Sequence, residues 1–389
     1  MRYESARLAG FSVSTAKKRR RGFDTSFFIV VLLLLGMGLV MVLSSSYARA
    51  YYDPGNVTGG NAVYYFVRQL LFAVLGIAAM LLSSKIPMDF YRRYSAHFFI
   101  AVIVMLALVP LVGVKANGAR RWLGVGGLTV QPSELAKLGV ILVFSSMICK
   151  FRGRMSSFKY GIIPFASVLV LIVGLLVLEP HFSASIIIIA IGGVMMFLGG
   201  VRLGWFAAAF GVVGGALAVL LMFFPYASSR ITTWRDPFSS SSDEGYQIVQ
   251  SLYSIGSGGL SGLGLGGSRQ KFLYLPEEHN DFIFSVVCEE TGFIGAALVL
   301  VLFAMLILRG YWIAIHCPER FSFLVCAGVT SLLAIQVFLN VAVVTNLIPC
   351  TGISLPFFSY GGTALLIELF EMGILLSASR DILNKQMRG

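Results

Sequence analysis

The sequence predicts an all-α polytopic integral membrane protein with about ten transmembrane helices and both termini in the cytoplasm. Of its 389 residues, 57% are hydrophobic and only 12% are charged, whereas about a quarter of a soluble domain is charged. So few charges cannot cover a water-facing surface, which excludes a soluble enzyme. The apolar residues also fall into ten separate runs, each about as long as the ~20 residues that a spanning helix needs.

The ten runs are separated by polar segments. The predicted spans cover residues 26–43, 64–84, 97–114, 133–149, 160–178, 184–200, 205–225, 282–308, 322–345 and 357–377. The basic run Lys17–Arg21 precedes the first span, and we expect a transmembrane helix there rather than a signal peptide, because no small-residue cleavage pattern follows it. We expect a basic N-terminal tail over 1–24, a single membrane domain over 25–380 with a large outer loop over about 227–281 between helices 7 and 8, and a cytoplasmic tail over 381–389.

The basic charge follows the predicted topology. The formal net charge is +12, and 20 of the 30 Lys and Arg residues fall in the predicted cytoplasmic segments. Basic residues gather in cytoplasmic loops and fix the orientation of a membrane protein, so we expect no nucleic-acid partner. The outer segments nevertheless carry Arg49, Lys115, Arg120, Arg121, Arg230, Arg235, Arg269 and Lys271. A site for an anionic ligand on the outer face would explain these residues.

The cysteines and the outer loop indicate which kinds of site and structure to expect. The five cysteines are odd in number and widely spaced, which indicates neither a disulfide framework nor a zinc site. The outer loop far exceeds the usual connection length. It is glycine-rich but interleaved with leucine and aromatic residues such as Tyr253 and Phe272, so we expect ordered segments packed on the membrane surface.

An acidic segment, LPEEHNDFIFSVVCEETG, opens the eighth predicted span. It places Glu277, Glu278 and Asp281 at the mouth of the helix, with Glu289 and Glu290 about two turns deeper. One of these carboxylates could be a general base whose pKa is raised by partial burial. Alternatively, they are solvated loop charges or a helix N-cap, a position that suits Asp281.

A second polar segment, NGARRWLGVGGLTVQPSELAKLG, precedes and enters the fourth span. Glu134 and Lys137 share a helical face at i, i+3, either as a structural ion pair or to hold a catalytic group or a phosphate. Arg120 and Arg121 flank Trp122, where they could anchor the chain at the membrane interface or bind phosphate oxygens.

A third segment, NLIPCTGISLPFFSYGG, interrupts the apolar pattern before the tenth span and includes Ser359. Broken backbone at membrane depth is tolerated where it is buried in protein or lines a cavity. Gln336 and Asn340 in the preceding span could either bridge helices or touch a ligand.

These segments together resemble the SEDS family (shape, elongation, division and sporulation). The likeness also includes Ser44–Ser46 and the string GLGLGGSRQKFLYLPEEHNDFIF, and it favours the FtsW and SpoVE branch over RodA. The resemblance implies that Asp281 is the essential outer acid, that Glu134 and Lys137 are the family's acid-lysine pair, and that Arg120 and Arg121 are its outer arginines.

The resemblance also implies an inverting peptidoglycan glycosyltransferase that polymerises lipid II at the outer face of the bacterial cytoplasmic membrane, at the septum or forespore membrane, with undecaprenyl pyrophosphate as leaving group. It implies a class B penicillin-binding protein and other division or sporulation membrane proteins as partners. A divalent cation (Mg or Mn) could assist, although no dedicated metal-ligand motif is visible. Candidate substrate-binding residues are Arg120, Arg121, Glu134, Lys137, Arg230, Lys271, Glu277, Gln336, Asn340 and Ser359.

Some residues depart from the family pattern. The chain reads EPHFSAS from Glu179, where many relatives carry a QPD-x-G type of motif, so Glu179 and His181 receive no role. Glu368 and Glu371 share a face of the tenth span, which we expect to look into the protein. Two other functions stay open: a lipid II flippase, and a scaffold that only activates a partner transpeptidase. The concentration of polar motifs in outer segments favours chemistry at the surface.

Overall fold

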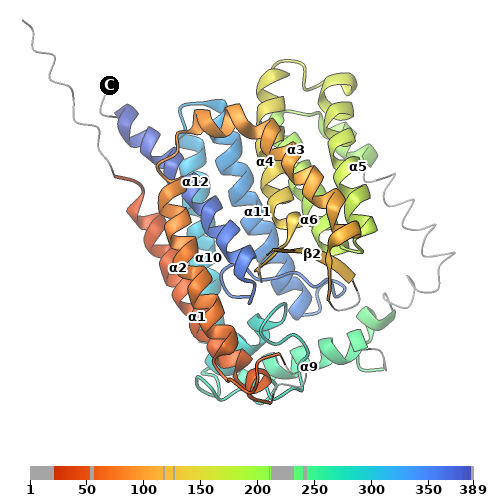
Figure 1. Ribbon diagram of the computed structural model, residues 1–389, viewed down its shortest axis with the longest axis vertical. Coiled ribbons are helices and arrows are strands. Elements are labelled where there is room, and N and C mark those ends of the chain that lie inside the picture. The colour runs from red at the N-terminus through yellow and green to blue at the C-terminus, as the bar shows by residue number, and fades with distance from the viewer. Residues whose placement is uncertain are drawn as a thin grey trace, which may run out of the picture.

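The computed structural model describes residues 22–52, 57–116, 119–125, 128–209, 211, 232–239 and 243–386 (Figure 1). Within these residues, nine helices are long and apolar enough to cross a membrane. They are α1 (Thr25–Tyr52), α2 (Tyr64–Ser83), α3 (Met88–Val112), α4 (Pro132–Lys150), α5 (Ile163–Leu178) with the π-helix η1 (Phe158–Ile162) before it, α6 (Phe182–Gly199), α10 (Ile283–His316), α11 (Arg320–Val344) and α12 (Gly362–Gln386). These helices confirm nine of the predicted spans. Most of the remaining one, over 205–225, lies outside the described residues, as do most of the N-terminal tail and Arg230.

The helices divide into inner and peripheral ones. In α4, α11 and α12, 72–78% of the most apolar stretch of 18 residues is buried inside the protein, compared with 22–28% in α2, α3 and α5. The peripheral helices therefore present apolar side chains to lipid. The inner helices can carry the polar residues that would be expensive against hydrocarbon.

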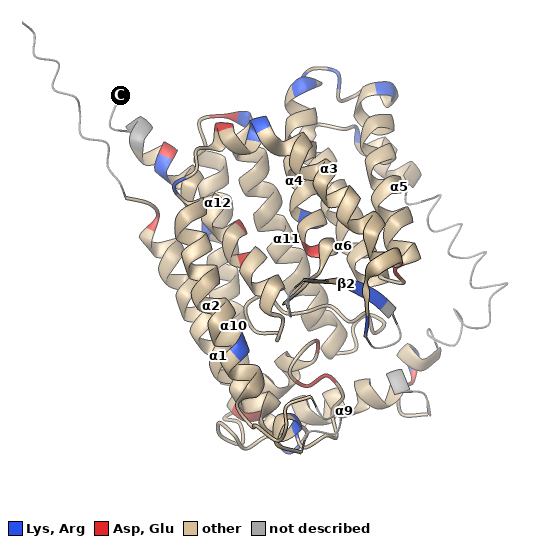
Figure 2. Cartoon of the chain, viewed as in Figure 1, with Lys and Arg blue, Asp and Glu red and all other residues tan. Residues whose placement is uncertain are grey.

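Charge distinguishes the two ends of the bundle. Lys and Arg gather at the end opposite α9 (Asp243–Gly258), as Figure 2 shows. The tendency of basic residues to stay in the cytoplasm assigns that end to the inside. The end that carries α9 and the small sheet is then the outer one, in agreement with the predicted orientation.

A small sheet covers part of the outer end and was not predicted from the sequence. Strands β1 (Val114–Ala116), β2 (Ala119–Val125) and β3 (Leu128–Val130) pair antiparallel in that order. Successive side chains on a strand point to opposite faces. The sheet therefore separates Arg120 from Arg121, which the sequence placed in one cluster.

The glycine-rich part of the outer loop is ordered and docks into a break in α10. At Gly292 the backbone is left-handed (φ 65°), a conformation that glycine adopts at little cost. The loop contacts the helix at this break: Leu263 N donates to Glu289 O and Gly264 N donates to Glu290 O, each at 3.0 Å. The helix resumes after the break and runs to His316, eight residues beyond the predicted end at 308.

Candidate active site

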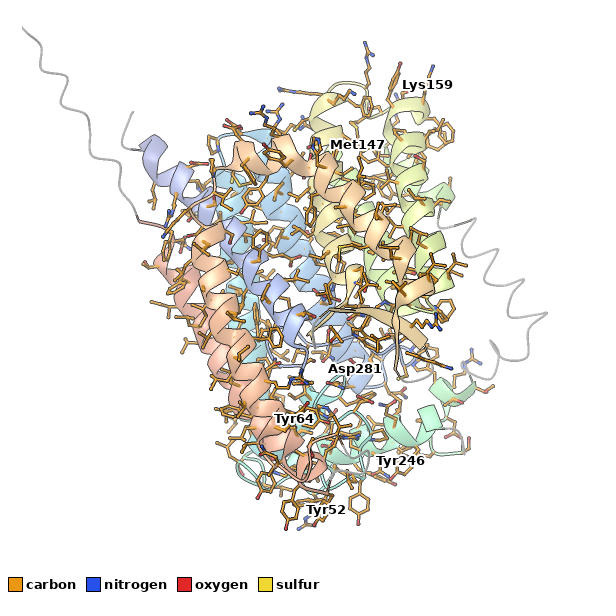
Figure 3. All side chains as sticks on the ribbon, in the orientation of Figure 1. Tyr52, Tyr64, Met147, Lys159, Tyr246 and Asp281 are labelled. Carbon is orange, nitrogen blue, oxygen red and sulfur yellow. The ribbon has the colours of Figure 1, made fainter. Side chains whose placement is uncertain are left out.

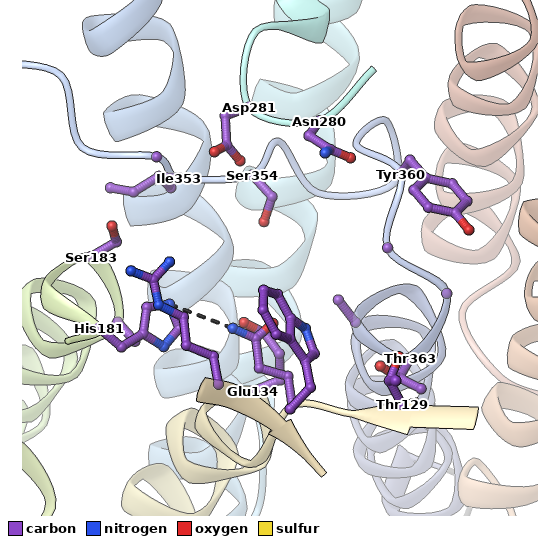
Figure 4. A pocket seen from close by; sticks show the side chains of 18 of the residues that line it. Thr129, Glu134, His181, Ser183, Asn280, Asp281, Ile353, Ser354, Tyr360 and Thr363 are labelled. Atoms are coloured by element: carbon purple, nitrogen blue, oxygen red, sulfur yellow. Dashed lines mark hydrogen bonds between the residues drawn. The ribbon is translucent and has the colours of Figure 1, made fainter. Parts of the chain in front are cut away.

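A cavity of about 430 Å³ opens at the outer end of the bundle, where β2 meets the N-terminal ends of α4, α6 and α12 (Figures 3 and 4). Six of the predicted site residues line it: Arg121, Glu134, Lys137, Glu277, Asp281 and Gln336. They come from segments that are far apart in the sequence. The fold therefore joins the three polar segments into one site.

The segment that carries Asp281 is held by its backbone. Asn340 Nδ2 donates to Asp281 O at 2.8 Å and to Ile353 O at 2.7 Å. Ser359 Oγ donates to Asn280 O at 2.8 Å. Asn340 and Ser359 do not line the cavity, and the structure gives them the indirect task of fixing this segment.

The Asp281 carboxylate itself faces the cavity. A Cβ at Gly352 would lie 2.9 Å from Asp281 Oδ2, so glycine leaves room for the carboxylate there. The N-cap of α10 is Phe282, without a side-chain capping bond, and Asp281 therefore does not cap the helix. Burial, with a smaller contribution from the negative charge of Glu277, raises the pKa of Asp281 from 3.8 to about 7. A general base works best with a pKa near the operating pH.

The neighbouring acid Glu278 is structural. Arg49 of α1 donates to both of its carboxylate oxygens, from Nε to Oε1 and from Nη2 to Oε2, each at 2.8 Å. The Glu278 side chain is fully buried. The backbone at Glu277 is left-handed (φ 54°), and Glu277 lines the cavity while Glu278 pairs with Arg49. Glu277 and Asp281 thus line the cavity, and Glu277 also accepts a hydrogen bond from Asn280 Nδ2.

The inner helix α4 supplies a second charged group that lines the cavity. Lys137 Nζ pairs with Glu134 Oε2 at 2.7 Å. Glu368 and Glu371 of α12 are buried, as the sequence predicted, and both interact electrostatically with Glu134 and Lys137. The Phe357 N–H donates to Glu368 Oε2 at 3.1 Å.

The two arginines of β2 have different surroundings. Arg121 lines the cavity, and its Nη2 donates to Pro180 O at 2.7 Å. Arg120 is exposed and donates to Pro110 O and Leu111 O at 3.0 and 3.2 Å. Arg120 does not line the cavity, so its predicted contact with substrate stays a prediction.

Lys271 also lies away from the cavity. Its Nζ pairs with Glu290 Oε1 at 2.9 Å and donates to Ser44 Oγ at 3.1 Å. This buried pair fastens the glycine-rich segment to α1 and α10. A direct contact between Lys271 and substrate likewise stays a prediction.

Among the site residues that sequence reasoning missed are Arg68 and His181, which both line the cavity. Arg68 is the one cation within α2, and it donates to Tyr64 Oη at 2.7 Å. A charged residue within an apolar span is a functional signal in its own right, and it could have identified Arg68. His181 gave no such signal, because its surroundings depend on the approach of β2 to the turn before α6.

No set of three or more His, Cys, Asp or Glu side chains among the described residues is placed to hold a metal ion. The acids that line the cavity are Glu134, Glu277 and Asp281. The divalent cation therefore stays a prediction from the sequence.

Comparison with known proteins places the chain in a family. The family model described as cell cycle protein FtsW, RodA and SpoVE matches residues 24–383. The chain belongs to this family. The sequence resemblance to SEDS proteins is thereby confirmed.

Individual relatives of the FtsW/RodA/SpoVE family match over nearly the whole chain. Stage V sporulation protein E of Bacillus subtilis is 39% identical over 92% of this chain and 97% of its own. The probable peptidoglycan glycosyltransferase FtsW of Trichlorobacter lovleyi is 36% identical, with 92% and 94% covered.

Solved structures agree with the fold. One, described as a peptidoglycan synthase complex that coordinates polymerization and crosslinking, contains a chain with a TM-score of 0.76 and 28% identity, covering 93% of this chain and 99% of that one. RodA of Thermus thermophilus gives a TM-score of 0.68 at 27% identity, with 93% and 98% covered.

Proposed function

We propose that this protein is a peptidoglycan glycosyltransferase that polymerises lipid II at the outer face of the cytoplasmic membrane. The observation that carries the proposal is the Asp281 carboxylate, which faces the outer cavity with its pKa raised to about 7. The names of the FtsW relatives support the same activity.

In the proposed reaction Asp281 takes the proton from the 4-hydroxyl of the acceptor N-acetylglucosamine. That oxygen forms a bond to the anomeric carbon of the donor N-acetylmuramic acid. The bond from this carbon to the lipid pyrophosphate breaks, and the pyrophosphate leaves with the electron pair. Because the attack comes from the face opposite the leaving group, the anomeric configuration inverts.

The cavity has the charges that such a substrate needs. Arg68, Arg121 and Lys137 line it, and cations that are already in place stabilise charge that develops on a leaving group. Glu134 holds Lys137 at 2.7 Å, which fixes the lysine before substrate arrives. The peripheral helices present apolar surface on which the lipid tail can lie.

We further propose that the protein works with a class B penicillin-binding protein and other membrane proteins of division or sporulation, at the septum or the forespore membrane. The similarity to a chain of a peptidoglycan synthase complex supports a crosslinking partner. The similarity to a stage V sporulation protein supports a sporulation role, and the FtsW relatives support division.

Glycan polymerisation from purified lipid II tests the proposal. The wild type and Asp281→Asn are each reconstituted with the partner transpeptidase. General-base catalysis contributes roughly 10²–10⁴-fold, so Asp281→Asn is expected to polymerise at least about 100-fold more slowly. Asp236→Asn is the matched control, because Asp236 is exposed in the same outer loop and does not line the cavity.

Wild-type rates from Asp281→Asn would remove Asp281 from the chemistry. Absence of polymer even from wild type, with an active transpeptidase present, would favour the flippase or the scaffold instead. Loss of activity in Asp236→Asn as well would indicate a general defect of the outer loop.

A further inference from the structure

Buried polar atoms without a partner surround the cavity, and they differ in kind from one wall to the other. Near the N-terminus of α6, the unpaired atoms of cavity-lining residues are the nitrogens Arg121 Nε and His181 Nδ1. On the segment that carries Asp281, the unpaired atom of a cavity-lining residue is the oxygen Asn280 Oδ1. These three atoms have no hydrogen-bond partner among the described residues. Because nearly all buried polar groups in folded proteins are hydrogen-bonded, a ligand is the natural partner. Figure 4 shows His181 and Asn280 on different walls of the one cavity.

The hydrogen bond to Gln131 fixes the proton of His181. Gln131 Nε2 lies 3.4 Å from His181 Nε2. An amide nitrogen only donates, so His181 Nε2 accepts and the ring proton is on Nδ1. His181 is only 9% exposed, and burial together with the positive charges of Arg121 and Lys137 lowers its pKa to about 3. The ring is therefore neutral at physiological pH, and Nδ1–H is a buried donor.

Helix α6 contributes in the same direction. His181 is its N-cap, without a side-chain capping bond, and the helix is 18 residues long. Ser183 and Ala184 of its first turn line the cavity. The N-terminus of a helix favours anions through its free N–H groups and its dipole. Arg121 is attached to this helix end, because its Nη2 donates to the carbonyl of Pro180, the residue before His181.

Glu179, the remaining acid of this turn, does not oppose an anion. It is 1% exposed and does not line the cavity. Burial raises the pKa of Glu179 to about 8, so the carboxyl is protonated at neutral pH. Arg121 and the helix end thus keep a net attraction for negative charge.

We infer that His181 and Arg121 bind the pyrophosphate of the polyprenyl-linked donor, with His181 donating from Nδ1 to a phosphate oxygen. The inference rests on the proposed function and adds the residue and the wall that hold the leaving group. Phosphate oxygens accept hydrogen bonds, which matches the two unpaired donors, whereas a sugar hydroxyl can donate to Asn280 Oδ1. The leaving group then lies at the N-terminus of α6, and the acceptor sugar lies beside Asp281.

Equilibrium binding of undecaprenyl pyrophosphate tests the inference without turnover. Full-length protein carrying Asp281→Asn is the parent, and His181→Gln and His181→Asn are added to it. The asparagine amide nitrogen falls near the position of Nδ1, whereas the longer glutamine places its amide near Nε2. A hydrogen bond to a charged group contributes about 1.5–3 kcal/mol, so His181→Gln is expected to weaken binding by about tenfold or more. His181→Asn is expected to stay within about threefold of the parent, because the donor is restored.

Two further probes identify what the site recognises. Undecaprenol, which has no phosphate, is expected to bind the parent and His181→Gln equally. Inorganic pyrophosphate is expected to compete with the lipid in the parent and to compete more weakly in His181→Gln. Equal lipid binding by parent and His181→Gln would overturn the inference. Equal loss in the Gln and Asn variants, extending to undecaprenol, would assign His181 to packing alone.

The role of His181 and the proposed function can be disproved independently of each other. If the wild type makes no polymer but His181→Gln still loses pyrophosphate binding, the glycosyltransferase proposal fails and the anion site stands. If the wild type makes polymer and His181→Gln binds the lipid as the parent does, only the role of His181 is lost.

Discussion

Two acidic pairs in one stretch of sequence have opposite surroundings. Glu277 and Asp281 precede α10 and line the cavity, whereas Glu289 and Glu290 lie within the helix and are fully buried. Glu289 accepts hydrogen bonds from Ser254 Oγ, Ser268 Oγ and Arg269 N. Asp281, by contrast, accepts no hydrogen bond on its carboxylate from the residues that the structure describes, and it lies beside Gly352.

The second pair also has a cation of its own. Glu290 pairs with Lys271 at 2.9 Å and accepts from Ser44 Oγ at 2.7 Å. Its lone pairs are used within the protein, and it joins the glycine-rich segment to α1 and α10. The difference teaches that a carboxylate whose bonding capacity is filled by its own fold is structural, and one whose capacity is left open is available for chemistry.

The largest expected effect comes from breaking the ion pair between Lys271 and Glu290. Lys271→Met leaves the carboxylate of Glu290 buried without its cation, which typically costs roughly 3–5 kcal/mol. We expect a marked fall in the melting temperature in detergent. The double variant Lys271→Met/Glu290→Leu is expected to recover much of the loss, because no uncompensated charge is left. If Lys271→Met alone were as stable as wild type, the Lys271–Glu290 ion pair would not be what holds the glycine-rich segment to α1 and α10.

An intermediate effect is expected from pH, and it concerns Asp281, whose carboxylate faces the cavity. Asp281 must be ionised to act as a base, and its pKa is about 7. The polymerisation rate should therefore fall as pH decreases below about 7, approaching tenfold per unit. The measurement is the pH profile of kcat/KM, with Glu289→Gln as control. The fall in kcat/KM below about pH 7 should persist in folded Glu289→Gln. A kcat/KM that does not change from pH 5 to 8 in wild type would contradict the role of Asp281.

The smallest effect concerns Glu179, a buried carboxyl of the α5–α6 turn whose oxygens have no partner among the described residues. Its folded pKa of about 8 exceeds the ordinary value of 4.5, so the folded state holds more protons than the unfolded state between these values. Stability contributed by this group is therefore present below about pH 4.5 and is lost as pH rises toward 8. Glu179→Gln should raise stability clearly more at pH 8 than at pH 5. Melting curves at the two pH values test this, and an equal shift at both would contradict it.

Sequence alone predicted the membrane class, nine of the spans and six of the residues around the cavity. Hydropathy is a strong signal for spans because each must be apolar over its whole length. It could not predict the break of α10 at Gly292 or the extension of the helix from 308 to His316, since a glycine in a helical pattern does not reveal whether the backbone breaks there. The three short strands carry too few residues for a clear alternation, and for this reason Arg120 and Arg121 were treated alike.

The remaining gaps concern contacts that form only in three dimensions. Asn340 and Ser359 were predicted to bind substrate, yet their hydrogen bonds hold the backbone of residues 280 and 281. Lys271 was grouped with outer cations, but its partner Glu290 lies 19 residues away on α10. The sequence gives no signal for His181, because the proton on its Nδ1 depends on the contact between Gln131 Nε2 and His181 Nε2.

The proposed mechanism depends most on Asp281 acting as a base rather than as a structural acid. The most direct measurement takes lipid II binding and single-turnover bond formation from the same sample of Asp281→Asn, with wild type beside it. We predict that binding stays within about threefold of wild type while bond formation falls at least about 100-fold. A loss of binding as large as the loss of bond formation, or bond formation at the wild-type rate, would contradict the account.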